Sequence, residues 1–135
     1  MGYDAPDGTL LMQVAVTVDL KSVPASAVTE KAIVALDRWT GTSDQYQPVV
    51  SYTVPAATSF ILSGIEVACS DYTAGVFRLT IAGVEQFADK SLQTTFNPIL
   101  PDVNLKAGDV ILLEAHSDGA TSITVDGSIE GKEVS

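Results

Sequence analysis

The side chains of this sequence that could carry chemistry are few and scattered. There is one histidine, His116, and one cysteine, Cys69. A hydrolase needs a nucleophile, a base and an orienting acid held together, and the residues around these two supply no such set. By alternation His116 lies at the end of a strand near the surface, while Cys69 shares the parity of apolar neighbours and is expected to be a small buried residue. The sequence therefore predicts no catalytic residues and a protein that is not an enzyme.

Acidic residues are abundant, but their spacing does not indicate a cofactor. One histidine and one cysteine are too few for the usual zinc ligands, and there is no Gly-rich phosphate loop. Seventeen acidic residues include no pair that the context marks for glycoside hydrolysis. Calcium is the alternative left open, because Asp71, Asp109, Asp118 and Asp126 lie in or beside expected turns. The spaced acidic pattern of a calcium loop is absent, however, and Asp-Gly is first a turn signal. We expect no metal and no cofactor.

The charges of the sequence argue against nucleic acid and membranes as partners and in favour of further copies of the chain. The net charge is −10, and the seven Lys and Arg residues are nowhere adjacent. A phosphate backbone or an anionic membrane surface requires clustered cations, so we expect binding to neither nucleic acid nor membrane. Only 18% of the residues are charged, which on a small body suggests that part of the surface is covered by further copies of the chain. The start lacks a basic signal-peptide region and no apolar run approaches membrane-spanning length, so synthesis in a cytoplasm is expected.

Period-two alternation dominates the sequence and predicts the elements that would position any site. The even positions from Leu10 to Leu20 are all apolar, as in a half-buried strand. Short runs with the same period, or nearly continuous apolar runs, recur further on, and Val, Ile and Thr are frequent in them. Those runs are Val50/Tyr52/Val54, Ile61/Ile65/Val67/Cys69, Phe77/Leu79/Ile81, Val110–Leu113 and Ile123/Val125/Ile129.

Turn residues separate these runs at short intervals. Pro55-Ala56, Ala82-Gly83, Pro101-Asp102, Gly108-Asp109 and Asp126-Gly127 are examples. About eight short strands at this spacing predict an all-β fold, an antiparallel β-sandwich or jelly roll, in place of βαβ units.

The segment 22–46 is ambiguous. Val28, Ala32, Leu36 and Trp39 fit one side of a helix, whereas the alternation over 32–37 suits a strand, which we favour. The polar loop 41–45 then separates an N-terminal strand or arm segment, residues 1–45, from a jelly-roll body, residues 46–135. The two make one folding unit, because about 45 residues cannot form an independent core.

Residues 49–135 resemble the small jelly-roll proteins of tailed-phage virions, in particular trimeric capsid decoration, or cement, proteins. The resemblance lies in Val54–Phe60 leading into Leu62–Val67, in Phe77–Val84, in Leu105–Leu112 and in the closing strand Ser122–Gly131. It implies a homotrimer that binds the major capsid protein on the outside of the head and is assembled in the host cytoplasm. In such proteins an N-terminal segment often contacts a neighbour or the capsid.

Within the N-terminal segment and its boundary, candidate interface residues are Tyr3, Leu11, Trp39 and Tyr46. Aromatic side chains beside loops, among them Trp39, Tyr46 and Tyr72, are also where sugar-binding modules place stacking platforms. A carbohydrate- or receptor-binding β-sandwich is therefore the alternative to a structural virion protein.

Overall fold

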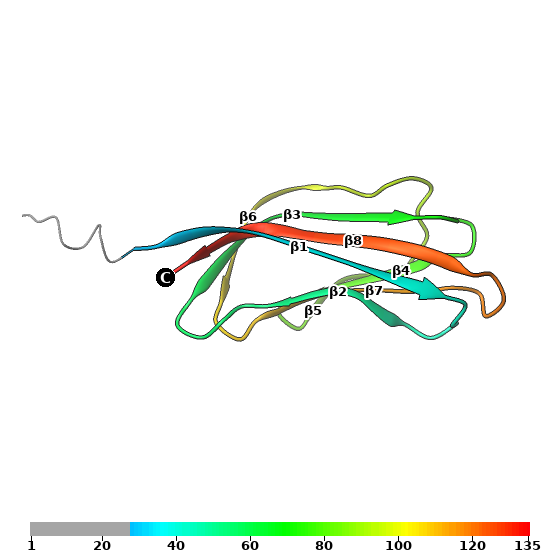
Figure 1. The fold of residues 1–135 in the computed structure, drawn as a ribbon, viewed down its shortest axis with the longest axis horizontal. Helices are drawn as coiled ribbons and strands as arrows, with labels where there is room; N and C mark the ends of the chain where they lie inside the picture. Colours follow the sequence, from blue (N-terminus) through cyan, green and yellow to red (C-terminus); the bar gives the residue numbers. More distant parts are fainter. Residues whose placement is uncertain (1–27) are drawn as a thin grey trace, which may run out of the picture. The chain divides into compact units, whose positions relative to one another are not determined.

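A computed structural model describes residues 28–135 of the chain, and its folded unit spans Glu30–Val134. Eight strands and no helix make up this unit (Figure 1). No helix in the described part is long and apolar enough to cross a membrane. The strands are β1 (Glu30–Gly41), β2 (Gln47–Thr53), β3 (Ser59–Cys69), β4 (Val76–Ile81), β5 (Val84–Lys90), β6 (Ile99–Lys106), β7 (Val110–His116) and β8 (Ile123–Val134).

The strands form two antiparallel sheets packed face to face, with the orders β1-β8-β3-β6 and β2-β7-β4-β5 (Figure 1). The pairs β1/β8, β2/β7, β3/β6 and β4/β5 are all neighbours. The chain is therefore one long antiparallel ribbon, folded at the β4–β5 hairpin and wound so that its strand pairs alternate between the sheets. This winding is the jelly roll, and the predicted fold class is confirmed.

The core lies between the two sheets and follows the alternation of each strand. Phe60, Leu62, Phe77, Leu113 and Ile129 are almost completely buried. Phe77 and Ile129 have the parity that the alternation of the sequence predicted to face inward, whereas Phe60 and Leu62 have the opposite parity to the predicted run Ile61/Ile65/Val67/Cys69.

Two β-bulges change which residues face inward. In β3 a register shift between Leu62 and Gly64 moves the inward parity from even to odd positions. Ile61 therefore lies on the outer face, although its number gives it the parity of Ile65. In β2 a shift between Pro48 and Val50 turns both Val49 and Val50 into the core.

The dipeptide Asp126-Gly127 is not a turn, as its composition suggested, but lies inside β8. A side chain at Gly127 would meet Val50 Cγ1 at 2.8 Å and Leu113 Cδ2 at 2.9 Å. The bulge of β2 fills the space opposite β8, so a residue without a side chain is needed there. Pro101-Asp102 likewise lies inside a strand, β6. Because β6 is an edge strand, a proline without a backbone donor is tolerated.

Within the ambiguous segment, residues 30–41 form a strand, β1, which pairs with β8 over its whole length. The sandwich thus already includes Glu30–Gly41, which the sequence placed with the N-terminal segment. The strand expected over 10–20 lies outside the described residues.

Candidate functional site

The interface residues proposed from sequence lie in different surroundings. Tyr3 and Leu11 are outside the described residues. Trp39 is half-buried on the inward side of β1 and packs against the core. Tyr46 lies just before β2 and contacts side chains from the other strands of its sheet. The rings of Trp39 and Tyr46 are therefore already in contact with the chain's own residues.

The residues with nucleophilic or basic side chains are not brought together. Cys69 ends β3 in one sheet, and His116 ends β7 in the other. The Cys69 thiol is 3.4 Å from the carbonyl oxygen of Asp71, and burial raises its pKa. His116 donates from Nδ1 to the carbonyl oxygen of Ser117 at 2.7 Å. Neither residue is placed to activate the other.

The acidic residues proposed from turns bind parts of the protein. Asp118 accepts from the backbone N–H groups of Ala120 and Thr121 at 2.8 and 2.7 Å, and these donors lower its pKa to about 2. Asp71 accepts from the N–H of Thr73, and Asp109 from that of Lys106. Across residues 28–135 no group of three or more potential ligands is arranged to hold a metal ion.

The outer face of the β2-β7-β4-β5 sheet carries a connected polar network centred on Tyr46. Arg78 donates to the Glu114 carboxylate at 2.8 Å, which raises the pKa of Arg78, and its guanidinium lies 4.1 Å from the centre of the Tyr46 ring. The Tyr46 hydroxyl donates to the carboxylate of Asp89 and accepts from its backbone N–H, both at 2.8 Å. The edge of the same ring meets His116, with centroids 4.6 Å apart. Within this network the polar groups satisfy one another.

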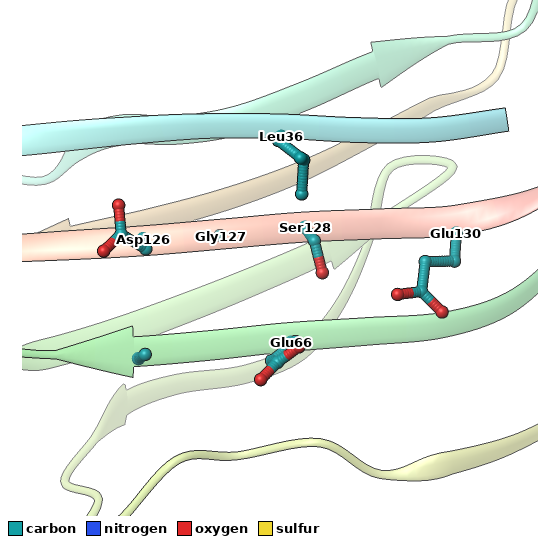
Figure 2. A pocket seen from close by; sticks show the side chains of 7 residues that line it. Leu36, Glu66, Asp126, Gly127, Ser128 and Glu130 are labelled. Atoms are coloured by element: carbon teal, nitrogen blue, oxygen red, sulfur yellow. The ribbon is translucent and has the colours of Figure 1, made fainter.

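The outer face of the other sheet contains an open groove of about 220 Å³. It runs over β8 between β1 and β3 (Figure 2). The cross-strand register explains its composition, because Ser128 on β8 lies opposite Leu36 on β1 and Glu66 on β3. Its lining consists of Leu36, Glu66, Ala68, Asp126, Gly127, Ser128 and Glu130.

Ion pairs neutralise both ends of the groove but not its centre. At one end Arg38 donates to both carboxylate oxygens of Asp126, at 2.6 and 3.2 Å, and lowers the pKa of that carboxyl group. At the other end Lys132 contacts Glu30 at 3.2 Å. Between them, no cation of the described part lies within ion-pair distance of Glu66 or Glu130.

The floor of the groove holds a polar atom without a partner. Ser128 is 6% exposed, and within the described part its hydroxyl has no hydrogen bond. A buried hydroxyl that is left unpaired destabilises a fold by about 1–3 kcal/mol. Figure 2 shows this hydroxyl and the Glu130 carboxylate directed toward the space between β8 and β3, where Glu66 lies.

The glycine of the β3 bulge makes room for one of these carboxylates. Glu130 lies opposite Gly64, and its Oε1 would be 3.1 Å from a side-chain carbon at that position. The absence of that carbon lets the Glu130 side chain extend across β3 toward Glu66. Bulges often redirect side chains next to functional sites in this way.

Beside the groove, β1 exposes two large apolar side chains. Val34 and Leu36 are 62% and 74% exposed, and alternation places both on the outer face. Single exposed apolar residues are ordinary. Here two of them are adjacent on one face, on an edge strand and next to unneutralised carboxylates, which together make a surface suited to contact with another molecule.

No protein-family model matches this sequence, and a comparison with curated proteins finds no match. Function must therefore be inferred from the chain's own residues. The groove offers hydrogen-bond acceptors and negative charge, but no imidazole lies beside its serine and no aromatic ring is among its lining residues. This arrangement is suited to binding a cationic or hydrogen-bond-donating group.

Sequence reasoning missed the groove. Parity alone places Ser128 and Glu130 on one face of their strand, but it gave no sign that Glu66, more than sixty residues earlier, lies beside them. Only the pairing of β3 with β8 brings these side chains together.

Proposed function

We propose that this chain is a structural virion protein that acts by binding: a decoration protein seated as a homotrimer on the outside of a tailed-phage head, where it stabilises the lattice of the major capsid protein. The jelly roll is common among viral capsid proteins and also among lectins, so the fold alone does not decide between them. The resemblance of residues 49–135 to decoration proteins favours the first.

The observation that carries the proposal is a nearly buried hydroxyl without a hydrogen-bond partner in the described part, on the β1-β8-β3-β6 face, whereas the Tyr46 network on the other face is internally paired. On the β1-β8-β3-β6 face, apolar side chains are exposed beside carboxylates and a buried hydroxyl without partners in the described part. The unpaired hydroxyl lowers the stability of the isolated domain, and the exposed apolar side chains do not add to it. They become favourable when a partner covers the face, which is what a protein that acts by docking requires.

Trimerisation raises the affinity with which such a face binds a lattice. Each copy contributes one modest contact to the lattice, and linked copies bind with a high effective concentration. The net charge of −10, carried on the surfaces left in solvent, would keep decorated particles from associating.

The experiment is co-sedimentation of the purified chain with phage heads, combined with light scattering to measure its mass in solution. We expect a trimer that sediments with heads and not with polysaccharide. A monomer at micromolar concentration that sediments with polysaccharide alone would overturn the proposal and favour the carbohydrate-binding alternative.

A truncated chain separates the two candidate contacts. Removing residues 1–20 eliminates Tyr3 and Leu11 and leaves the groove intact. If the truncated protein still sediments with heads as well as the full chain, contact is made by the sandwich face. Loss of sedimentation with the trimer preserved would assign the contact to the N-terminal segment.

A further inference from the structure

We propose that the groove over β8 receives a cationic side chain, lysine or arginine, of the protein on which this domain docks. The proposal rests on the docking function inferred above and names the chemistry of the partner. Glu66 and Glu130 bind the charged head, the Ser128 hydroxyl accepts a hydrogen bond from it, and Leu36 and Ala68 contact the aliphatic stem.

The spacing of the acceptors fits one cationic group. Ser128 and Glu66 are directly opposite each other on paired strands, which places their backbones about 5 Å apart. Glu130 is two residues further along the same strand and points to the same face, about 7 Å from Ser128. An ammonium or guanidinium group between the three can contact all of them.

The ion pairs at the groove ends make the centre selective for an external cation. Arg38 is engaged by Asp126 and Lys132 by Glu30. Since these two cations on the same face are paired elsewhere, neither neutralises Glu66 or Glu130. A cation from a partner therefore finds the negative charge available and meets no nearby positive charge that is free to repel it.

The Ser128 hydroxyl is the independent indication of a ligand. An acidic cluster alone is typical of a solvated surface, but a hydroxyl that is 6% exposed and lacks a partner in the described part is not. Its neighbour Leu36 is largely exposed, so this side chain can move aside without loss of packing. A donor entering between Glu66 and Glu130 would provide the missing hydrogen bond.

The apolar lining distinguishes a side chain from a metal ion. Leu36 and Ala68 border the groove, and lysine and arginine cover apolar surface with their stems while their charged heads bind acceptors. A divalent ion gains nothing from an apolar lining. Calcium, for example, requires six or more oxygen ligands.

The test is a titration of the full chain followed by nuclear magnetic resonance, with Nα-acetyl-lysine methylamide as the probe. Nα-acetyl-norleucine methylamide, which lacks the ammonium group, is the control ligand, and Nα-acetyl-arginine methylamide is the second cation. We expect saturable shifts at residues 66, 128 and 130 with both cations, with dissociation constants on the order of 10 mM, and no saturation with norleucine.

Matched variants localise the effect. The double variant Glu66→Gln/Glu130→Gln keeps the shape of both side chains and should weaken lysine binding at least about tenfold. Glu85→Gln removes one charge from an exposed position on β5, in the opposite sheet, and should change binding less than about twofold.

Each outcome of this titration tests the inference without the use of phage heads. Absence of saturable shifts with both cations, equal binding by norleucine, or equal loss in Glu85→Gln would overturn it. So would stronger shifts at the same residues with calcium chloride, which would assign the groove to a metal ion. Because the titration uses no phage heads, its failure is distinct from a failure to co-sediment, which would overturn only the proposed function.

Discussion

Two groups of polar side chains, one on each outer face of the sandwich, have opposite surroundings. On the β2-β7-β4-β5 face, Tyr46, Arg78 and Glu114 belong to one network in which donors meet acceptors at 2.8 Å. On the β1-β8-β3-β6 face, Glu66 and Glu130 have no cation in the described part, and Ser128 has no hydrogen-bond partner there. The first arrangement stabilises the domain by itself. The second lowers its stability unless another molecule supplies the missing partners, and this contrast is the physical basis for proposing that docking uses the β1-β8-β3-β6 face.

The largest expected effect is loss of the satisfied network. Tyr46→Ala removes an edge-to-face contact with His116, a cation–π contact with Arg78 and two hydrogen bonds to Asp89. We expect the free energy of unfolding to fall by about 2 kcal/mol, measured by urea denaturation. Lysine-probe binding in the groove should not change. A stability loss within about 0.5 kcal/mol, the ordinary range for surface positions, would show that the Tyr46 network does not stabilise the domain.

A smaller effect of opposite sign is expected at Ser128. Ser128→Ala removes a buried hydroxyl that has no partner, so the free energy of unfolding should rise by about 1 kcal/mol while lysine-probe binding weakens. Ser70 is the control, because its hydroxyl accepts a hydrogen bond from the backbone N–H of Thr124 at 2.9 Å. Ser70→Ala should lower stability and leave binding intact. If both serine variants lower stability equally, Ser128 has a partner in solution and the contrast between the faces is lost.

The sequence predicted the strands better than the surfaces. A nearly continuous apolar run located β7. Alternation located β4 and β8, in which buried residues recur with a period close to two, and it located β2 despite its bulge. It failed for β5 and β6, edge strands with many exposed or turn-forming residues, Pro101 among them. It also assigned Gly127 to a turn. A glycine is needed there because two valines of β2 pack against this position, and these valines lie far away in the sequence.

The groove was beyond sequence reasoning for a related reason. Which side chains meet on a sheet face depends on strand order and register, and the bulge at Leu62/Gly64 resets the register of β3. Aromatic residues such as Trp39 and Tyr46 drew attention as anchors because of their type. Their packing, with Trp39 against the core and Tyr46 on Arg78, became visible only in the folded chain.

Acid titration extends the comparison to the β7–β8 connection. The pKa of Asp118 is about 2 in the folded chain, below the ordinary value of about 3.9. Its charged form is therefore favoured by folding, and this stabilisation is present above about pH 4 and lost as the pH falls toward 2. Asp118→Ala should lower the melting temperature at pH 7, and the difference from the unchanged protein should shrink between pH 4 and 2. A difference that stays constant over this range would mean that the carboxylate charge is not involved.

The smallest expected effect is at Glu130. Glu130→Gln removes repulsion between like charges on neighbouring strands, so the free energy of unfolding should rise by about 0.3 kcal/mol. Glu114→Gln is the opposite case, because Glu114 is paired with Arg78 at 2.8 Å, and it should destabilise. Thermal melts of the two variants in low salt show whether each change stabilises or destabilises the fold. Destabilisation by Glu130→Gln would indicate that this carboxylate has a partner in the free protein.

The central claim, that the β1-β8-β3-β6 face is the docking face, is tested most directly by labelling carboxylates with a carbodiimide and glycine ethyl ester. The free protein and the protein bound to phage heads are labelled in parallel and compared by mass spectrometry. We predict that labelling of Glu66 and Glu130 falls severalfold on the particle while labelling of Glu85, on the opposite sheet, stays the same. Unchanged labelling of Glu66 and Glu130, with protection at Glu85, would contradict the account.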